Sequence, residues 1–238
     1  MAAIGRDTTI SWLGHGTFHI VTPEGKKLLI DPWLAGNPMF PEARRAEAIR
    51  GATHVLVTHG HGDHAANALA IATELAIPIA CIHELSEWFE REGASAIGFG
   101  KGGTIDLNGA KVTMVNACHS SSIDFKGGNP IPAGSEAGFM IAGDGHTAYV
   151  SGDTDIMADM DWMGEYHRPD VGILASGGHY TMDMKRAAFA ARKYFDFKLV
   201  IPCHYRTFPL LEQSAAALVE GLPGVRVVEP QVLEPIAV

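Results

Sequence analysis

The chain contains little cysteine, no long apolar run and no excess of basic residues. Its cysteines, Cys81, Cys118 and Cys203, are far apart and include no C-x-x-C pair, which indicates free thiols in a reducing compartment rather than a disulfide framework. The opening MAAIGRDTT has neither a basic start nor an apolar core, so we predict no signal peptide and expect a cytoplasmic protein. No apolar stretch is long enough for a bilayer, so no membrane partner is expected.

Basic residues are outnumbered, since 18 Lys and Arg against 27 Asp and Glu give a formal net charge of -9. A nucleic-acid footprint needs Lys and Arg to neutralise phosphates, so no nucleic-acid partner is expected. The acidic charge does not exclude a small anionic substrate, because local metal ions, where a protein binds them, can outweigh the global field. With 47% hydrophobic and 19% charged residues the composition is that of an ordinary globular protein, and we expect one domain over residues 1–238.

Short alternating or wholly apolar runs predict strands, and longer Ala- and Leu-rich runs predict helices. In the first part, strands are predicted at 9–14, 17–21, 27–31, 54–58 and 77–82, with helices at 65–76 and 84–92. Asp63 is a candidate N-cap for the helix at 65–76. The middle predicts strands at 103–107, 110–118, 136–143 and 146–152, and the last third alternates strand and helix at 170–176, 183–195, 198–203 and 212–221. This order predicts an α/β fold in which two sheets pack face to face with helices outside.

The stretch THGHGDH, residues 58–64, follows the predicted strand at 54–58. Residues two apart in an extended loop point the same way, so His59 and His61 can reach one ion together. The glycines between them add no side chain and allow tight backbone conformations. Asp63 and His64 point elsewhere and can serve a second ion. Four ligands in six residues are too dense for one tetrahedral site with a free water position, which favours two adjacent metals.

Three later strand ends supply further ligand candidates for such a pair of ions. His119 follows one predicted strand, Asp153 follows another and can bridge two ions, and His204 follows a third. Cys118 and Cys203 each precede one of these histidines directly. On a pleated strand they face the opposite side, so we leave both thiols out of the site.

The pattern T-H-x-H-x-D-H, followed by single His, Asp and His residues at strand ends, resembles the metallo-β-lactamase superfamily over nearly the whole chain. WLGHGTFHI, LLIDPWLAGNP, ACHSSSI, SGDTDIMADM and the block from GGHYTMD to IPCHYRTFP look like its uncharacterised metal-dependent hydrolase branch, related to the ascorbate-6-phosphate lactonases. The resemblance implies an αββα sandwich of two mixed β-sheets flanked by helices.

By this resemblance, the first metal is held by His59, His61 and His119, the second by Asp63, His64 and His204, and both by a bridging Asp153. Two cations about 3.5–4 Å apart lower the pKa of a shared water enough to give hydroxide near neutral pH, so no serine or cysteine nucleophile is needed. Asp63 would also orient this hydroxide. Ligands without thiolate suit zinc, manganese or iron. Zinc is the default, and manganese is the metal that the lactonase relatives favour.

Three other residues have two readings each. His15 lies in a turn that resembles the family's opening loop and can contact substrate or satisfy a turn carbonyl. His179 ends a strand as the ligands do and can bind or protonate the leaving group, although relatives often carry an Asp-Asn-Phe type sequence there. Asp31 can orient a ligand imidazole or cap the turn at Pro32.

The predicted function is that of a dinuclear metal hydrolase in which a metal-bridging hydroxide attacks a small ester, lactone, amide or phosphoester. The alternatives are a phosphodiesterase or nuclease, which the charge disfavours, and an iron-dependent redox enzyme on the same fold. The apolar side chains in the loop at 33–40 either line a pocket or cover a neighbouring subunit, which leaves a homo-oligomer open.

Overall fold

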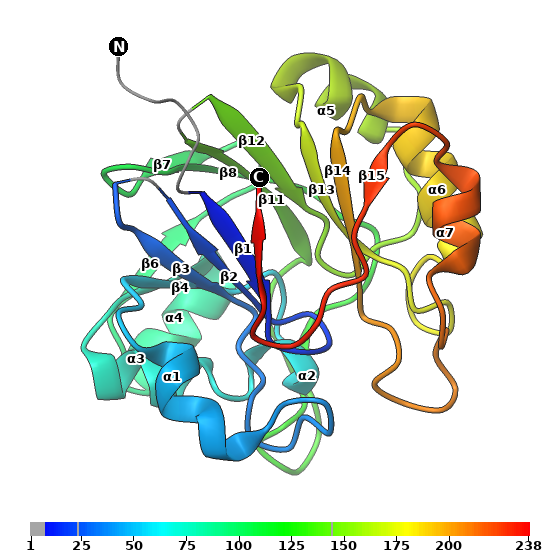
Figure 1. The fold of residues 1–238 in the computed structure, drawn as a ribbon. Helices are drawn as coiled ribbons and strands as arrows, with labels where there is room; N and C mark the ends of the chain where they lie inside the picture. Colours follow the sequence, from blue (N-terminus) through cyan, green and yellow to red (C-terminus); the bar gives the residue numbers. More distant parts are fainter. Residues whose placement is uncertain (1–7, 23, 144) are drawn as a thin grey trace.

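The computed structural model describes residues 8–22, 24–143 and 145–238, in which two seven-stranded sheets lie face to face (Figure 1). Helices cover the outer face of each sheet: α1 (Arg45–Ile49), α3 (Ala68–Leu75) and α4 (His83–Arg91) on the first, and α5 (Met160–His167), α6 (Met184–Tyr194) and α7 (Ala216–Gly221) on the second. This layering confirms the predicted αββα sandwich. The first seven residues, which belong to the opening used to predict the absence of a signal peptide, lie outside the described residues.

The first sheet is mixed, with the strand order β16-β1-β2-β3-β4-β5-β6. Neighbours from β16 to β3 pair antiparallel and those from β3 to β6 pair parallel. The strands are β1 (Thr9–Trp12), β2 (Phe18–Val21), β3 (Lys27–Ile30), β4 (His54–Leu56), β5 (Ile79–Ile82), β6 (Ala96–Phe99) and β16 (Pro235–Ala237).

The second sheet has the order β15-β14-β13-β12-β11-β8-β7. Its strands are β7 (Thr104–Asp106), β8 (Lys111–Asn116), β11 (Ala137–Gly143), β12 (His146–Val150), β13 (Val171–Ala175), β14 (Leu199–Cys203) and β15 (Arg226–Val227). Because β8 and β12 are both antiparallel to β11, they run in the same direction, and β13 and β14 are parallel to β12. The carboxyl ends of β8, β12 and β14 therefore meet at one edge of this sheet.

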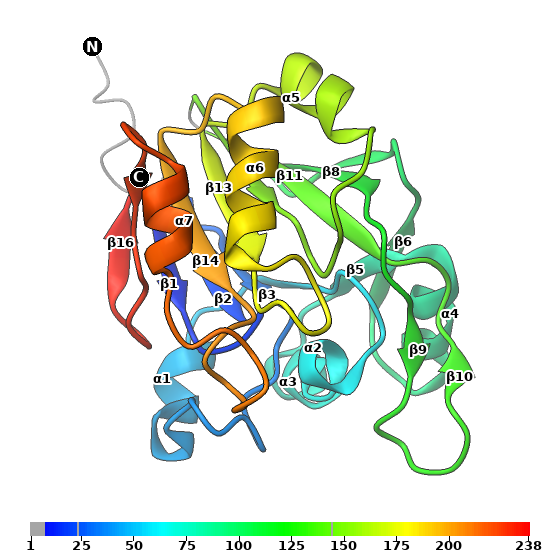
Figure 2. The same ribbon diagram turned by 90° about the vertical axis from the view of Figure 1, so that its right-hand side faces the viewer.

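A separate two-stranded ribbon, β9 (Ser122–Ile123) and β10 (Ile131–Pro132), projects below the sheets near α2 in Figure 2. The helical segments are η1 (Glu42–Arg44), α1 (Arg45–Ile49), α2 (Gly62–Ala65), α3 (Ala68–Leu75), α4 (His83–Arg91), α5 (Met160–His167), α6 (Met184–Tyr194) and α7 (Ala216–Gly221). Of the helices in the described ranges, none has the length and apolar character needed to cross a membrane.

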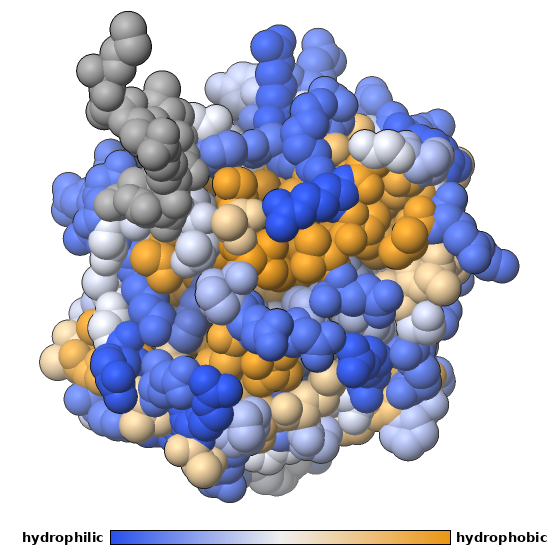
Figure 3. Space-filling model, in the orientation of Figure 1, coloured by the Kyte–Doolittle hydropathy of each residue, from blue (hydrophilic) through white to orange (hydrophobic). Residues whose placement is uncertain are grey.

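The core lies between and around the two sheets. Every residue of β13 and β14 is buried, as expected for parallel strands covered on both faces. Leu34 and Phe40 of the apolar loop are also buried in this core, at 1% and 5% exposure, whereas Trp33 and Met39 are half-buried, so only the latter two can line a pocket or meet a neighbouring subunit. On the face seen in Figure 1, hydrophobic residues gather in a band in the region of β14 and β15 (Figure 3).

The predicted helix at 65–76 differs from the observed one. It is divided into α2 and α3, and α2 begins at Gly62 with His61 as its N-cap. The expectation that Asp63 caps a helix is therefore wrong, because Asp63 lies inside the first turn of α2. Asn67 separates the two helices, and its side-chain oxygen accepts hydrogen bonds from the backbone N–H groups of Leu34 and Ala35, at 2.6 and 2.8 Å.

Candidate metal centre

The predicted ligands come from both sheets. The segment after β4 in the first sheet carries the residues of the THGHGDH motif, and α2 begins within it. His119, Asp153 and His204 follow β8, β12 and β14, whose carboxyl ends share one edge of the second sheet. The topology thus brings these residues to one place, from positions far apart in the chain.

The first set consists of His59, His61 and His119. Each offers a ring nitrogen within 4.8 Å of those of the other two. Nε2 of His59 lies 3.0 Å from Nδ1 of His61, and the two rings meet edge to face. His59 is fully buried, whereas His61 and His119 are partly exposed, so the first set opens to solvent on the side of the latter two.

The second set consists of Asp63, His64 and His204, whose ligand atoms also lie within 4.8 Å of one another, together with one of His15. Oδ2 of Asp63 is 3.6 Å from Nε2 of His204. His64 and His204 are buried, while the Asp63 side chain retains 31% exposure. Asp63 is therefore the member of the second set that solvent reaches.

Asp153 lies between the two sets and is 3% exposed. Its Oδ2 is 3.0 Å from Nε2 of His204, 3.6 Å from Nε2 of His119 and 4.0 Å from Nε2 of His59. Its Oδ1 is 3.4 Å from Nε2 of His64. One carboxylate thus faces imidazoles of both sets, as a bridging ligand must.

Several buried atoms at this point have no hydrogen-bond partner. They include Nε2 of His64 and Nε2 of His204, which lie 3.4 and 3.0 Å from the Asp153 carboxylate without forming an aligned hydrogen bond, and Oδ1 of Asp153. Leaving a buried polar group unsatisfied costs about 1–3 kcal/mol, so atoms of this kind that converge need an explanation. Imidazole nitrogens and carboxylate oxygens are ligands that divalent transition metals bind, and a cation would satisfy all three atoms at once. These residues therefore fit the metal ions that the sequence predicts.

Most groups of the cluster are in the form that binds a cation, but Asp153 raises the pKa values of both His64 and His204, although burial opposes this. Burial and then the nearby His64 lower the pKa of His59, and burial lowers that of His119, so both imidazoles are neutral. Burial alone would raise the pKa of Asp153, but His204 and His64 hold it well below its usual range. Burial opposes protonation of His204 as well, yet Asp153 raises its pKa to about 9. A bound cation would displace that proton, since metal ligands must be deprotonated.

Asp31 orients His64. Its Oδ2 accepts a hydrogen bond from Nδ1 of His64 at 2.8 Å and one from the Thr58 hydroxyl at 2.6 Å, while its Oδ1 accepts from the Thr58 N–H at 2.7 Å. A hydrogen bond on Nδ1 fixes the ring so that Nε2 points to Asp153. Of the two readings of Asp31, the structure favours orientation of a ligand over capping of the turn.

Gly60 is explained by a close approach of the β9–β10 ribbon. A Cβ atom at Gly60 would lie 2.7 Å from the Cβ of Ala133 and 3.0 Å from the carbonyl oxygen of Ser122. The neighbouring backbone is held as well, because the N–H of Gly62 donates to Oδ1 of Asp124 at 2.8 Å. The spacing glycines of the motif thus allow the ribbon to pack directly on it.

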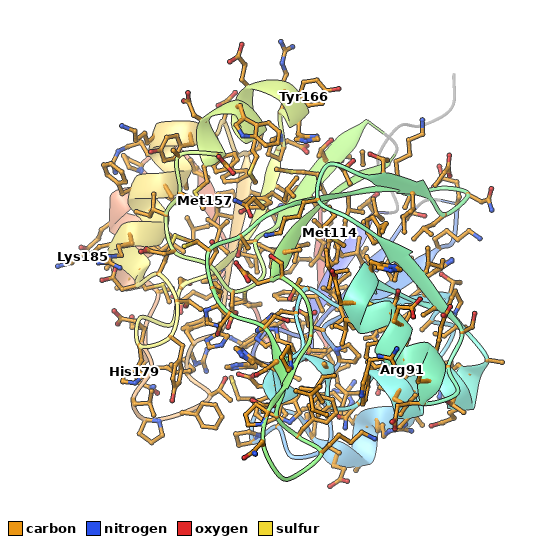
Figure 4. The ribbon with its side chains drawn as sticks, turned by 180° about the vertical axis from the view of Figure 1, so that it is seen from behind. Arg91, Met114, Met157, Tyr166, His179 and Lys185 are labelled. Carbon is orange, nitrogen blue, oxygen red and sulfur yellow. The ribbon has the colours of Figure 1, made fainter. Side chains whose placement is uncertain are left out.

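His15 and His179 lie in different environments. His15 is fully buried and contacts Asp63, with Nε2 3.0 Å from Oδ2. His179 is exposed in the loop between β13 and α6, where its ring packs against Tyr180, and Figure 4 shows it at the edge of the molecule. Within the described part of the chain, the groups of ligand atoms that lie within 4.8 Å of each other do not include His179. Its catalytic role stays a prediction.

Sequence reasoning missed Thr207, whose hydroxyl lies 2.8 Å from Nδ1 of His15. The sequence contains no pattern that marks it, and the segment that leads to Thr207 includes positive φ angles at His204 and Arg206, which residue spacing does not encode. Cys203 is buried, and burial followed by Asp153 raises the pKa of its thiol, so it presents no thiolate.

Known proteins resemble this chain in sequence and in structure. The family model described as "Beta-lactamase superfamily domain" matches residues 26–205. A UPF0173 metal-dependent hydrolase of Cereibacter sphaeroides is 68% identical over 96% of this chain and 99% of its own length. One from Paracoccus denitrificans is 65% identical, with 95% and 98% covered. The solved structure of Igni18, a metallo hydrolase from Ignicoccus hospitalis, matches with a TM-score of 0.84 and 31% identity over 96% of this chain and 97% of that one.

Proposed function

We propose that this chain, which belongs to the β-lactamase superfamily and is a metal-dependent hydrolase, works with two divalent ions on a small ester, lactone, amide or phosphoester. The observation that carries the proposal is the position of Asp153. Its Oδ2 lies 3.0 Å from His204 in the second set and 3.6 Å from His119 in the first. A single ion bound by one set of ligands would leave unexplained a buried carboxylate that faces imidazoles of both sets.

In this proposal the first set holds one ion, the second set holds the other, and Asp153 contacts both. When bound, the two ions would supply an activated water as nucleophile and polarise the scissile bond. Zinc is the metal ion that we expect, and manganese and iron are compatible with the same donor atoms.

The protein residues determine how substrate reaches this centre. His59, His64 and Asp153 are buried and close the inner side to bulk water. The exposed fraction of Asp63 places its carboxylate on the open side, where it can orient the attacking water. His64 and Asp63 lie close together, and His64 holds the pKa of Asp63 well below its usual range although burial acts in the opposite direction. Asp63 therefore acts as an ionised hydrogen-bond acceptor rather than as an acid.

A small substrate fits the electrostatics better than nucleic acid does. The chain has a formal net charge of -9, which repels a phosphate backbone at distances beyond the metal centre. A small ester or phosphoester meets mainly the local field of the ions.

The test is a substrate panel of lactones, phosphodiesters, thioesters and β-lactams, offered to protein loaded with zinc, manganese or iron. We expect hydrolysis of at least one class, with a loss of kcat of a hundredfold or more, on the order of removing one key electrostatic group, in the Asp63→Asn variant. The control is Asp196→Asn, which alters an exposed carboxylate paired with Lys198.

The outcomes separate the alternatives. Hydrolysis that persists unchanged in Asp63→Asn would contradict the proposal. Cleavage of RNA or DNA that vanishes in the same variant would support the nuclease instead, and oxygen consumption by the iron form alone would support the redox enzyme.

A further inference from the structure

We infer that His15 is a positioning residue that holds Asp63 in place for the second ion and links it to His204. The inference rests on the proposed pair of ions, and it assigns His15 a role other than contact with substrate.

Both ring nitrogens of His15 are engaged. Nε2 lies 3.0 Å from Oδ2 of Asp63, and Nδ1 lies 2.8 Å from Oγ1 of Thr207. An ionised carboxylate only accepts hydrogen bonds, so Nε2 carries the hydrogen. In the neutral ring Nδ1 then accepts from the Thr207 hydroxyl at 2.8 Å, which is closer than the other two acceptors of that hydroxyl, Met39 Sδ and the Tyr205 carbonyl oxygen, both at 3.3 Å. The side chain is 0% exposed. A fully buried ring with both nitrogens occupied has no atom left for substrate.

The bond to Nε2 fixes the direction of the Asp63 carboxylate. Aspartate has only two side-chain torsions, so holding one oxygen sets the position of the other as well. Asp63 is also the partly exposed member of the second set, which makes it the one that needs an external restraint. Histidine ligands are commonly held by a carboxylate, and here a histidine holds a carboxylate ligand in the same way.

The backbone of His15 reaches a second ligand. Its carbonyl oxygen accepts hydrogen bonds from the backbone N–H of His204 at 3.0 Å and from the Trp12 indole N–H at 2.8 Å. Its φ of 54° lies in the left-handed region, which is unfavourable for a non-glycine residue. Strain of this kind persists where surrounding contacts enforce it and is found at functional sites. One strained residue thus joins Asp63 beside the first sheet to His204 at the end of the second.

The rest of the turn contacts the third member of the second set. A Cβ atom at Gly16 would lie 2.7 Å from Cε1 of His64, so only glycine lets the turn approach that ring. The His15 ring itself packs against the rings of His204 and His64, at centroid distances of 3.8 and 5.8 Å. All of these contacts involve the second set, so we expect His15 to control the affinity of one ion and not of both.

Isothermal titration of the metal-free protein with zinc, in the presence of a competing chelator, tests this directly. We expect His15→Phe to lower the affinity for one ion by about 10–100-fold, as typical for loss of a group that orients a ligand, and to leave the other within about twofold. His15→Gln keeps an amide donor for Asp63 and should recover part of the affinity. Thr207→Val should lower the zinc affinity by a factor between those of His15→Gln and the wild type, and Thr207→Ser should bind zinc as the wild type does. The control is His19→Gln, which changes another buried histidine.

Two results would overturn the inference. Equal loss of both ions in the His15 variants would indicate a general structural role, and unchanged zinc binding with a raised KM would indicate contact with substrate. If His15→Phe does not fold, the His15→Gln and Thr207 variants give the same comparison.

A second measurement does not depend on metal. Long-range nitrogen–proton NMR of the metal-free protein, with the His15 signals assigned from His15→Gln, should show hydrogen on Nε2; hydrogen on Nδ1 would refute the positioning role.

The zinc titration also separates this inference from the proposed function. If the wild type binds only one ion and the His15 variants weaken its binding, the dinuclear proposal fails while the role of His15 stands. If the wild type binds two ions and the His15 variants bind both with unchanged affinity, the role of His15 fails while the dinuclear proposal stands.

Discussion

His15, Asp31 and His204 have positive φ angles, of 54°, 45° and 57°. The left-handed region costs a non-glycine residue about 1–2 kcal/mol each, because Cβ crowds the following carbonyl. Each of the three makes a contact at the candidate metal centre: His15 with Asp63, Asp31 with His64, and His204 with Asp153. At the scale of single residues, the chain thus tolerates unfavourable backbone angles where side chains point into the candidate metal centre.

The Asp31→Asn variant tests whether Asp31 orients His64. An amide nitrogen in place of Oδ2 would remove the acceptor of both the His64 ring and the Thr58 hydroxyl, and one in place of Oδ1 would remove the acceptor of the Thr58 N–H. We expect zinc affinity to fall by about 10–100-fold. The matched control is Asp170→Asn, because Asp170 likewise pairs with a histidine, His146, and accepts from a backbone N–H. Equal zinc affinities of the two variants would refute this role.

His19 gives the wild type a defined acid sensitivity. Burial, followed by Lys27, lowers the pKa of His19 to about 3 from a usual 6.5. Between these two pH values the unfolded chain binds a proton that the folded chain does not, so the free energy of unfolding decreases as the pH falls. The loss is roughly 1.4 kcal/mol per pH unit within that window.

Urea unfolding of the wild type and of His19→Leu between pH 7.5 and 4.5 measures this contribution. We expect the stability of the wild type relative to the variant to be constant above about pH 6.5 and to decline below it, because only the wild type carries the titrating imidazole. A difference that stays constant over the whole range would contradict the assignment.

At the scale of elements, strand direction and a close ribbon contact determine the site. β8, β12 and β14 run the same way and deliver His119, Asp153 and His204 to one sheet edge. The β9–β10 ribbon then packs on the loop between β4 and α2, close to Gly60. The ligand loop is thereby held from two sides.

A Gly60→Ala substitution tests this contact. The new methyl group would lie 2.7 Å from the Cβ of Ala133, and forcing extra volume into a packed site typically costs about 1–3 kcal/mol. We expect that loss in the free energy of unfolding, with partial recovery on adding Ala133→Gly. Gly100→Ala is the control, since a Cβ there meets nothing within 4 Å. Similar effects of Gly60→Ala and Gly100→Ala would show that the ribbon does not constrain the loop.

Much of the fold and the convergence of the site could be predicted from the sequence. Alternating and apolar runs located most strands, and the motif at 58–64 with His119, Asp153 and His204 indicated which residues would meet. β6 and α5 were not predicted; β6 is an edge strand with no buried residue and α5 buries only Met160 and Met163, so neither has a strong apolar pattern. The role of Asp31 and the contact of Thr207 with His15 depend on left-handed backbone angles, which residue spacing does not encode.

At the scale of the whole molecule, the two sets of ligands join segments that are distant in sequence. His59 follows β4 of the first sheet and His204 follows β14 of the second, and His64 lies between Asp31 and Asp153. We therefore expect metal binding to stabilise the folded chain against global unfolding rather than to affect one loop.

Metal should raise the thermal midpoint of the wild type. A ligand at 100 times its Kd adds about 2.7 kcal/mol per site, and for a chain of this size each kcal/mol raises Tm by about 2–4 °C. Differential scanning calorimetry with and without zinc should thus show an increase of roughly 5–10 °C per occupied site, and excess chelator should reverse it. Asp153→Asn should lose most of the increase. The same zinc-dependent increase in that variant would contradict a shared role for Asp153.

The central claim is that two ions lie on either side of one carboxylate. Anomalous difference maps from crystals of the zinc-loaded protein, recorded on both sides of the zinc absorption edge, test it most directly. We predict two peaks, one beside His59, His61 and His119 and one beside Asp63, His64 and His204, with Asp153 between them. A single peak at full zinc occupancy, or two peaks of which neither contacts Asp153, would contradict the account.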